Sequence, residues 1–192
     1  MERRLRRNWL ERFTVIQQLR SVLSLPTDGT PYNQGRARAT QRRKARAALR
    51  LGVTTHMVGQ DSERRELLAR ANAFERVNPR PLYRVEQPEN DDLLDFDFWM
   101  AAHHEGEAIV LAVIAVDGEF ALLRYLRTLT HTDASSAARY LVTEKVADAL
   151  VARGVRYLVN GVNPFKMPAG LLHFSRMVGF RLVRLRVGRP LA

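Results

Sequence analysis

The sequence contains no cysteine, and only three of its 31 basic residues are lysines. Without cysteine the chain can form no disulfide, no thiolate metal site and no cysteine nucleophile. It also lacks any apolar run of the roughly 18 to 20 residues that a membrane-spanning helix needs. Its arginine-rich start has neither the apolar core nor the small-residue cleavage site of a secretory signal. We therefore expect a soluble, cytoplasmic protein.

Positive charge is concentrated at the start of the chain. Residues 1–60 hold thirteen basic and three acidic residues, 13 − 3 = +10, whereas the remainder holds 18 − 17 = +1 of the net +11. Between Arg84 and Arg124 there is no lysine or arginine at all, although ten aspartates and glutamates fall there. This asymmetry predicts an anionic partner for the N-terminal segment. The acidic strand from Asp91 to Asp97 is expected to be a solvated face, or a dock for the basic segment of the same or a neighbouring chain.

Two helices are predicted in the basic segment. Leu5, Trp9, Phe13, Ile16, Leu19 and Leu23 recur at three- and four-residue spacing, which predicts an amphipathic helix from residue 3 to about 25. Its apolar side chains could also bind a protein partner or a second copy of the chain. A second helix is expected over residues 36–51, ended by Gly52. The cations predicted to bind nucleic acid lie on it: Arg36, Arg38, Arg42, Arg43, Lys44, Arg46 and Arg50.

From residue 53 onward, strand and helix patterns alternate. Strands are predicted at 53–58, 94–102, 108–116, 120–129, 155–160 and 180–187, and helices at 62–77, 133–153 and 168–178. The strand over 94–102 alternates apolar residues with Asp95, Asp97 and Trp99, which is typical of a half-buried strand. Glu105-Gly106 and Asp117-Gly118 supply turns, so three strands form an antiparallel meander. We predict an α/β fold, divided into a basic helical segment (1–52) and a mixed-sheet domain (53–192).

Several motifs resemble the close of the GNAT acyltransferase fold. They are Tyr140-Leu141-Val142, the run from Gly154 to Leu158, and the run from Gly170 to Gly179-Phe180. The basic run from Arg42 to Val53 is similar to the segment before the first strand in the FemAB-like branch. This resemblance implies a mixed sheet with a central meander and the transfer of an acyl or aminoacyl group.

The loop that binds acetyl-CoA in ordinary members of that fold is different here. Those members use a glycine-rich loop before the long helix, because backbone N–H groups then bind pyrophosphate. This chain has no glycine between Glu119 and Arg153, and Asp133 would repel a phosphate. Only helix-end donors at Ser135 and Ser136 remain for anion binding. We therefore predict no tight binding of acetyl-CoA, and we name acyl-CoA or aminoacyl-tRNA as possible donors.

The resemblance places catalysis in a cleft between the strands 120–129 and 155–160. We assign His131 as general base and Tyr140 as hydrogen-bond donor to the leaving group, with Arg124 and Lys166 as anion anchors. His131 could instead be a solvated loop residue, and the loop with Lys166 a polar surface loop. Strict alternation would put Arg124 with Leu126 on one face of its strand, and Tyr125 with Arg127 on the other.

No metal site is predicted, because His103 and His104 are adjacent and point to opposite faces of an extended chain. Together the patterns predict an N-acyltransferase that moves an acyl or aminoacyl group from a phosphate-rich donor, such as an aminoacyl-tRNA, to an amine. The alternative is a GNAT-like nucleic-acid-binding or assembly protein without catalysis.

Overall fold

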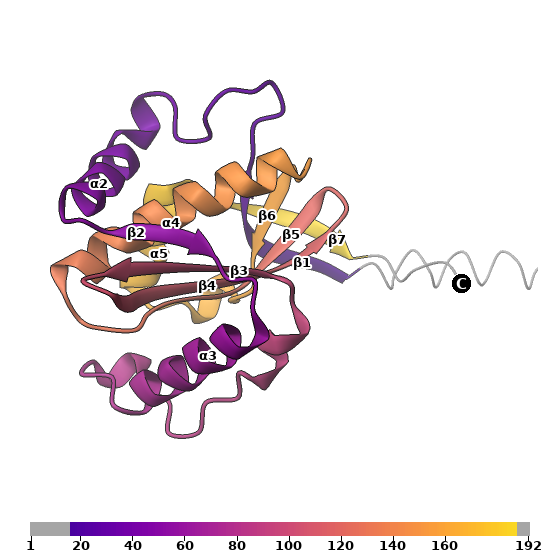
Figure 1. The fold of residues 1–192 in the computed structure, drawn as a ribbon. Coiled ribbons are helices and arrows are strands. Elements are labelled where there is room, and N and C mark those ends of the chain that lie inside the picture. The colour runs from indigo at the N-terminus through magenta and orange to yellow at the C-terminus, as the bar shows by residue number, and fades with distance from the viewer. Residues whose placement is uncertain (1–15, 188–192) are drawn as a thin grey trace, which may run out of the picture.

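The computed structural model describes residues 16–187, which form one mixed seven-stranded sheet with helices on both faces (Figure 1). The strand order is β2-β3-β4-β5-β6-β1-β7. The strands are β1 Ile16–Ser24, β2 Thr54–Met57, β3 Phe98–His104, β4 Glu107–Asp117, β5 Phe120–Thr128, β6 Tyr157–Asn160 and β7 Arg181–Val187. The helices are α2 Ala39–Arg50, α3 Asp61–Arg76, α4 Asp133–Ala152 and α5 Ala169–Val178, and short 3-10 turns are η1 Arg36–Arg38, η2 Pro81–Tyr83, η3 Asp91–Asp95 and η4 Pro164–Lys166. None of the helices within 16–187 is long and apolar enough to cross a membrane.

The predicted meander is confirmed. β3, β4 and β5 pair antiparallel in sequence order. The β3–β4 turn places Glu105 at φ 53° and Gly106 at φ 81°, the left-handed pair that a two-residue hairpin turn requires. β6 then adds in parallel to β5, so the sheet changes from antiparallel to parallel pairing between these two strands.

The predicted N-terminal helix is wrong over the residues that the structure describes. Residues 16–24 form β1, which pairs antiparallel with β6 on one side and β7 on the other. Neighbouring residues Val22 and Leu23 are both buried, although successive side chains of a strand point to opposite faces. Pairing with two strands outweighs the helical spacing of a few apolar residues. The earlier part of that predicted helix, including Trp9 and Phe13, lies outside the described residues.

Two apolar cores lie on the two faces of the sheet. α2 and α4 pack against each other and cover one face, while α3 covers the part of the other face formed by β3 and β4 (Figure 1). The larger core includes Leu23, Leu141 and Phe174, so α5 lies on the α4 side. The smaller core holds Trp99 and Leu111 under α3. The end of the sheet where β5 and β6 separate lies between these two helical layers.

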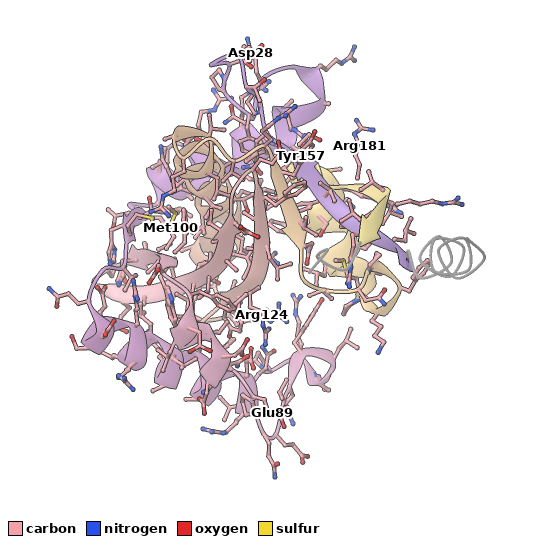
Figure 2. All side chains as sticks on the ribbon, turned by 90° about the vertical axis from the view of Figure 1, so that its right-hand side faces the viewer. Asp28, Glu89, Met100, Arg124, Tyr157 and Arg181 are labelled. Atoms are coloured by element: carbon pink, nitrogen blue, oxygen red, sulfur yellow. The ribbon has the colours of Figure 1, made fainter. Side chains whose placement is uncertain are left out.

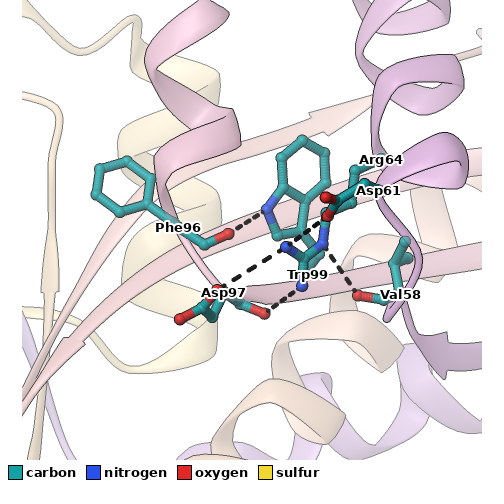
Figure 3. Close-up of polar contacts among 6 residues, drawn as sticks. All are labelled: Val58, Asp61, Arg64, Phe96, Asp97 and Trp99. Carbon is teal, nitrogen blue, oxygen red and sulfur yellow. Dashed lines mark hydrogen bonds and ion pairs between the residues drawn. The ribbon is translucent and has the colours of Figure 1, made fainter.

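The half-buried strand predicted for 94–102 is also corrected. Residues 91–95 form η3, and all of Phe98 to Ala102 are buried, because β3 lies inside the sheet with α3 and α4 on its two faces. Figure 3 shows the polar contacts at the start of β3, where the Trp99 indole donates to the Phe96 carbonyl at 2.7 Å. Arg64 of α3 donates to the backbone oxygens of Val58 (3.4 Å) and Asp97 (3.1 Å). The two bonds from Arg64 hold α3 against the sheet.

Candidate active site

A β-bulge in β5 decides which side chains face the candidate site. The pairing of β4 with β5 shifts between Val113 and Ile114, and Arg124 is the extra residue. A bulge of one residue reverses the alternation beyond it. Arg124, Tyr125 and Arg127 therefore all contact carboxylates on the α3 side of the sheet. The predicted separation of Arg124 from the other two is wrong for this reason.

Arg124 forms a two-point ion pair with a carboxylate of the acidic stretch. Its Nε and Nη2 atoms donate to the two oxygens of Asp92, in η3, at 2.8 and 3.0 Å. Figure 2 shows Arg124 between the strands and the loop that carries Glu89. This pair of parallel bonds connects the loop to β5, since a guanidinium matches a carboxylate at two points.

Glu75, near the end of α3, is a buried carboxylate at the floor of the site. Only 7% of the residue is exposed. The Tyr125 hydroxyl donates to Oε1 at 2.8 Å, Asn90 Nδ2 donates to Oε2 at 3.2 Å, and Arg127 Nε lies 3.8 Å from Oε1. Burial, followed by the charge of Glu75, raises the pKa of Tyr125 far above its ordinary value. The phenol therefore stays protonated and remains a donor to the carboxylate.

Sequence reasoning missed Glu75, although a signal was present. On α3 the buried side chains Leu67, Leu68 and Ala71 recur at helical spacing, and Glu75 continues the same stripe. A carboxylate on an apolar helix face is rare unless it is paired. Glu75 on this stripe therefore indicates a buried polar network.

An open groove of about 880 Å³ runs across the α3 side of the sheet beside this network. Its charged end includes Arg124, Arg127 and Lys166 with Glu75. Its apolar wall comes from β5, β6, β7 and the 82–88 loop: Phe120, Leu122, Val159, Leu185, Leu82 and Val85. The groove can thus hold a substrate that has both an apolar part and an anionic or polar group.

A second, smaller cavity of about 120 Å³ lies at the start of α4. Arg80, Arg127 and Arg139 line it together with His131 and Ser136. Arg139 lies over the Phe174 ring at 4.8 Å, and its Nε is buried without a hydrogen-bond partner among the described residues. Burial lowers the pKa of Arg139, although tyrosines nearby oppose the effect. Three guanidiniums around one small cavity favour an anionic group there.

The groove and the arginine-lined cavity share part of one wall. Glu75, Tyr83, Arg127 and Leu171 line both. The buried carboxylate therefore lies where a group bound in one cavity can meet a group bound in the other. The spacing of residues in the sequence does not predict that α3, β5 and α4 meet at this wall.

The strands β5 and β6 separate beside this wall. Their parallel pairing ends at Leu123 and Asn160, and the Gly161 N–H donates to the Leu123 carbonyl at 3.0 Å. Beyond this point β5 continues to Thr128 while the chain after β6 turns away, leaving a gap of about 20 Å³. The predicted separation of these strands is therefore present.

The structure groups some of the predicted site residues and separates others. Arg124 and Lys166 line the groove, while His131, Ser135 and Ser136 line the arginine cavity. Ser135 and Thr132 cap α4 reciprocally at 3.1 Å, so the Ser135 hydroxyl is used within the helix start. Tyr140 is buried against Phe174 with ring centroids 5.0 Å apart, in the core and away from both cavities.

The second predicted basic helix is present as η1 and α2, which ends before Gly52 at φ 80°. Its buried side packs on α4, where Gln41 Nε2 donates to the Tyr140 carbonyl at 2.7 Å. No carboxylate forms an ion pair with its cations within residues 16–187. Those cations are Arg36, Arg38, Arg42, Arg43, Lys44, Arg46 and Arg50.

Solved structures share this arrangement of strands and helices. The C-terminal domain of a protein assigned as a lysylphosphatidylglycerol synthetase from Agrobacterium fabrum aligns over 87% of this chain and 57% of its own, with a TM-score of 0.60 and 15% identity. L-PGS from Bacillus licheniformis aligns over 88% and 58%, with a TM-score of 0.62 and 15% identity. The fold is that of the GNAT-like acyltransferases. A conserved protein of unknown function from Bacteroides thetaiotaomicron also aligns, with a TM-score of 0.63 and 11% identity over 93% and 64%.

These similarities establish the fold. The chain spans between 57% and 64% of the length of these three structures. No family model matches the sequence, and no curated protein matches it. The predicted GNAT-like fold is thereby confirmed, while the assignment to the FemAB-like branch stays a prediction.

Proposed function

We propose that this protein transfers an aminoacyl group from tRNA to an amine. The observation that carries the proposal is the buried Glu75 carboxylate, in the wall common to the groove and the arginine-lined cavity. Two structural neighbours are named for the synthesis of a lysyl lipid, and a lysyl group is an aminoacyl group. That name favours aminoacyl over other acyl donors.

In the proposed complex the donor's phosphates bind in the arginine-lined cavity. Arg80, after α3, and Arg139, on α4, supply positive charge, and Arg127 lies in the wall that adjoins the groove. Arginine suits this role because its guanidinium binds phosphate oxygens at two points. The acceptor occupies the groove, where Lys166 and Arg124 anchor any anionic group that it carries.

The reaction balances without a further reagent. The acceptor nitrogen attacks the ester carbonyl, forming a C–N bond as the C–O bond to the tRNA ribose breaks. Glu75 accepts the proton from the nitrogen and returns it to the departing ribose oxygen. Its hydrogen bonds from Tyr125 and Asn90 orient the carboxylate, and Arg127 is positioned to stabilise negative charge on the carbonyl oxygen.

A second candidate function, nucleic-acid binding without catalysis, is favoured by one observation. The exposed cations of α2 have no carboxylate partner within the described residues. A protein that kept the fold and lost the reaction would retain this surface. Glu75 is required as general base for aminoacyl transfer, whereas nucleic-acid binding without catalysis does not require it.

The test is a transfer assay with charged tRNA and a panel of amines, comparing wild type with Glu75→Gln. Loss of a general base is expected to lower the rate by about 10² to 10⁴-fold. Glu66→Gln, an exposed change on the same helix, is the matched control and should keep full activity. His131→Ala separates the two candidate bases, because only the true base should give the large loss. A wild type that is inactive with every donor would refute the proposal and favour the binding function.

A further inference from the structure

A third cavity, of about 490 Å³, lies on the α5 side of the sheet. It is bordered by Ser21 of β1, the end of α5, the start of β7 and the residues just before α2. Figure 2 shows Arg181, at its edge, well apart from Arg124 in the groove. This basic cavity is therefore separate from the candidate active site.

Three arginines from distant parts of the sequence line the basic cavity. Arg38 comes from η1, Arg176 from the last turn of α5 and Arg181 from β7. No aspartate or glutamate lines the cavity, and none of the three arginines forms an ion pair within residues 16–187. On the α3 side, by contrast, Arg124 and Arg127 are both next to carboxylates.

Arg38 is held at this place by the fold. Its guanidinium lies directly on Gly179, where a Cβ atom would overlap the arginine at 1.5 Å, and Nη2 lies 3.5 Å from the Gly179 carbonyl. Burial lowers the pKa of Arg38, and the charge of Arg181 adds to that effect, while Tyr32 opposes it. The C-terminus of α5 stabilises one nearby cation. It does not account for three arginines lining one cavity.

The positive surface continues from the basic cavity onto α2, which begins one residue after Arg38. Arg43, Lys44, Arg46 and Arg50 are all exposed on this helix. A small anion would need only one of these points, whereas a polymer of phosphates can contact several at once. A flat bilayer surface fits a concave cavity beside a convex helix poorly.

We propose that the basic cavity and the exposed face of α2 together bind the phosphate backbone of RNA, with tRNA as the physiological ligand. The choice of tRNA rests on the proposed function, while the binding of RNA does not. The backbone enters the cavity between Arg38, Arg176 and Arg181 and continues along α2. Sequence is not read there, because phosphate contacts position a nucleic acid without specifying its bases.

The experiment measures binding of labelled, uncharged tRNA to the full chain by fluorescence anisotropy between 50 and 200 mM salt. The test variant is Arg176→Glu with Arg181→Glu, two exposed side chains whose replacement should leave the fold intact. Affinity is expected to fall at least tenfold. The slope of log K against log salt should become shallower by about 2, roughly one for each phosphate that the variant no longer neutralises. A thermal melt checks folding.

Arg65→Glu with Arg76→Glu is the matched control, because both residues are exposed on α3 and the change in net charge is the same. Equal weakening by both double variants would show an effect of net charge alone and would overturn the proposal. Unchanged tRNA binding in the test variant would also overturn the proposal. This includes the case in which the test variant loses binding to anionic phospholipid vesicles or to an acidic protein instead.

Transfer from a short aminoacyl oligonucleotide separates this proposal from the proposed function. The test variant should transfer normally from the short donor and poorly from full-length tRNA. If no wild-type transfer is found but the tRNA affinity still falls in the test variant alone, the function fails and the RNA surface stands. If transfer succeeds with both donors in the test variant, the RNA surface fails and the function stands.

Discussion

Glu75 and Tyr125 form a hydrogen-bonded pair of side chains in the candidate site. Both are buried, and their hydrogen bond of 2.8 Å joins α3 to β5. A bond from a neutral donor to a carboxylate is stronger than one between two neutral groups. The pair therefore contributes to stability as well as to the position of the proposed base.

Replacing Tyr125 with phenylalanine should lower the free energy of unfolding by about 1 to 3 kcal/mol, because a buried carboxylate loses a donor. Urea denaturation measures the difference. Tyr157→Phe is the control, since Tyr157 stacks on Phe120 at 5.3 Å and its hydroxyl forms no hydrogen bond within the described residues. Equal stability of wild type and Tyr125→Phe would contradict the role of this bond.

The same variant should change the dependence of stability on pH. Folding raises the pKa of Tyr125 above its unfolded value of 10.0. Above pH 10 the unfolded chain loses a proton that the folded chain keeps, so stability falls as pH rises. This part of the alkaline loss should be absent in Tyr125→Phe, as measured by urea midpoints from pH 8 to 11. An identical alkaline loss in both proteins would show that Tyr125 does not cause it.

At the scale of elements, the junction of β5 and β6 depends on the absence of a side chain at residue 161. A Cβ atom on Gly161 would lie 2.9 Å from the Leu123 backbone oxygen, at the point where the strands separate. Gly161→Ala should therefore destabilise the protein by about 1 to 3 kcal/mol, since backbone must move. Gly59→Ala is the control: its Cβ meets nothing within 4 Å, so stability should stay the same or rise slightly. A Gly161→Ala protein as stable as the control would contradict the close approach.

The start of α4 bears on the choice of donor. The Ser135 N–H is bonded to the Thr132 hydroxyl, and the Ser136 N–H to the Thr132 carbonyl at 3.0 Å. These donors are used within the chain, and the loop has no glycine to open its backbone to a pyrophosphate. Calorimetry with acetyl-CoA should therefore show no dissociation constant in the low micromolar range. A dissociation constant in that range would show that the arginines of the cavity at the start of α4 bind the pyrophosphate in place of the missing loop.

At the scale of the whole molecule, β1 places residues 16–24 of the basic N-terminal segment in the sheet. It is paired on both sides, with Leu25 N–H also donating to the Arg156 carbonyl at 2.8 Å. Deletion of residues 1–51 should therefore abolish folding, because β6 and β7 lose the strand between them. Circular dichroism and a thermal melt measure this. A cooperative melt of the truncated chain would show that the domain predicted from residue 53 folds alone.

This position also decides how RNA binding can be tested. A truncation would remove the cations and the sheet together, so loss of binding would have no clear cause. Charge reversal at exposed side chains such as Arg176 and Arg181 avoids this, because neither is buried.

The sequence determined the elements whose patterns are local. Alternation in β4 and β5, helical spacing in α3 and α4, and turn residues such as Gly106 predicted these elements within a few residues, because each pattern reflects burial of one face. The resemblance of the closing motifs to the GNAT fold also identified the architecture.

The tertiary structure decided what depends on contacts between distant residues. β1 became a strand because β6 and β7 supply its partners, and Phe98 to Ala102 became buried on both faces because helices cover both. Tyr125 and Arg127 lie on the same side of the sheet as Arg124 because of a bulge that no local spacing encodes. Glu75 meets Tyr125 fifty residues away. The periodicity of a sequence indicates which side of a helix or strand is buried. Which helices and strands contact one another depends on the packing of the whole chain, and the candidate site lies at such contacts.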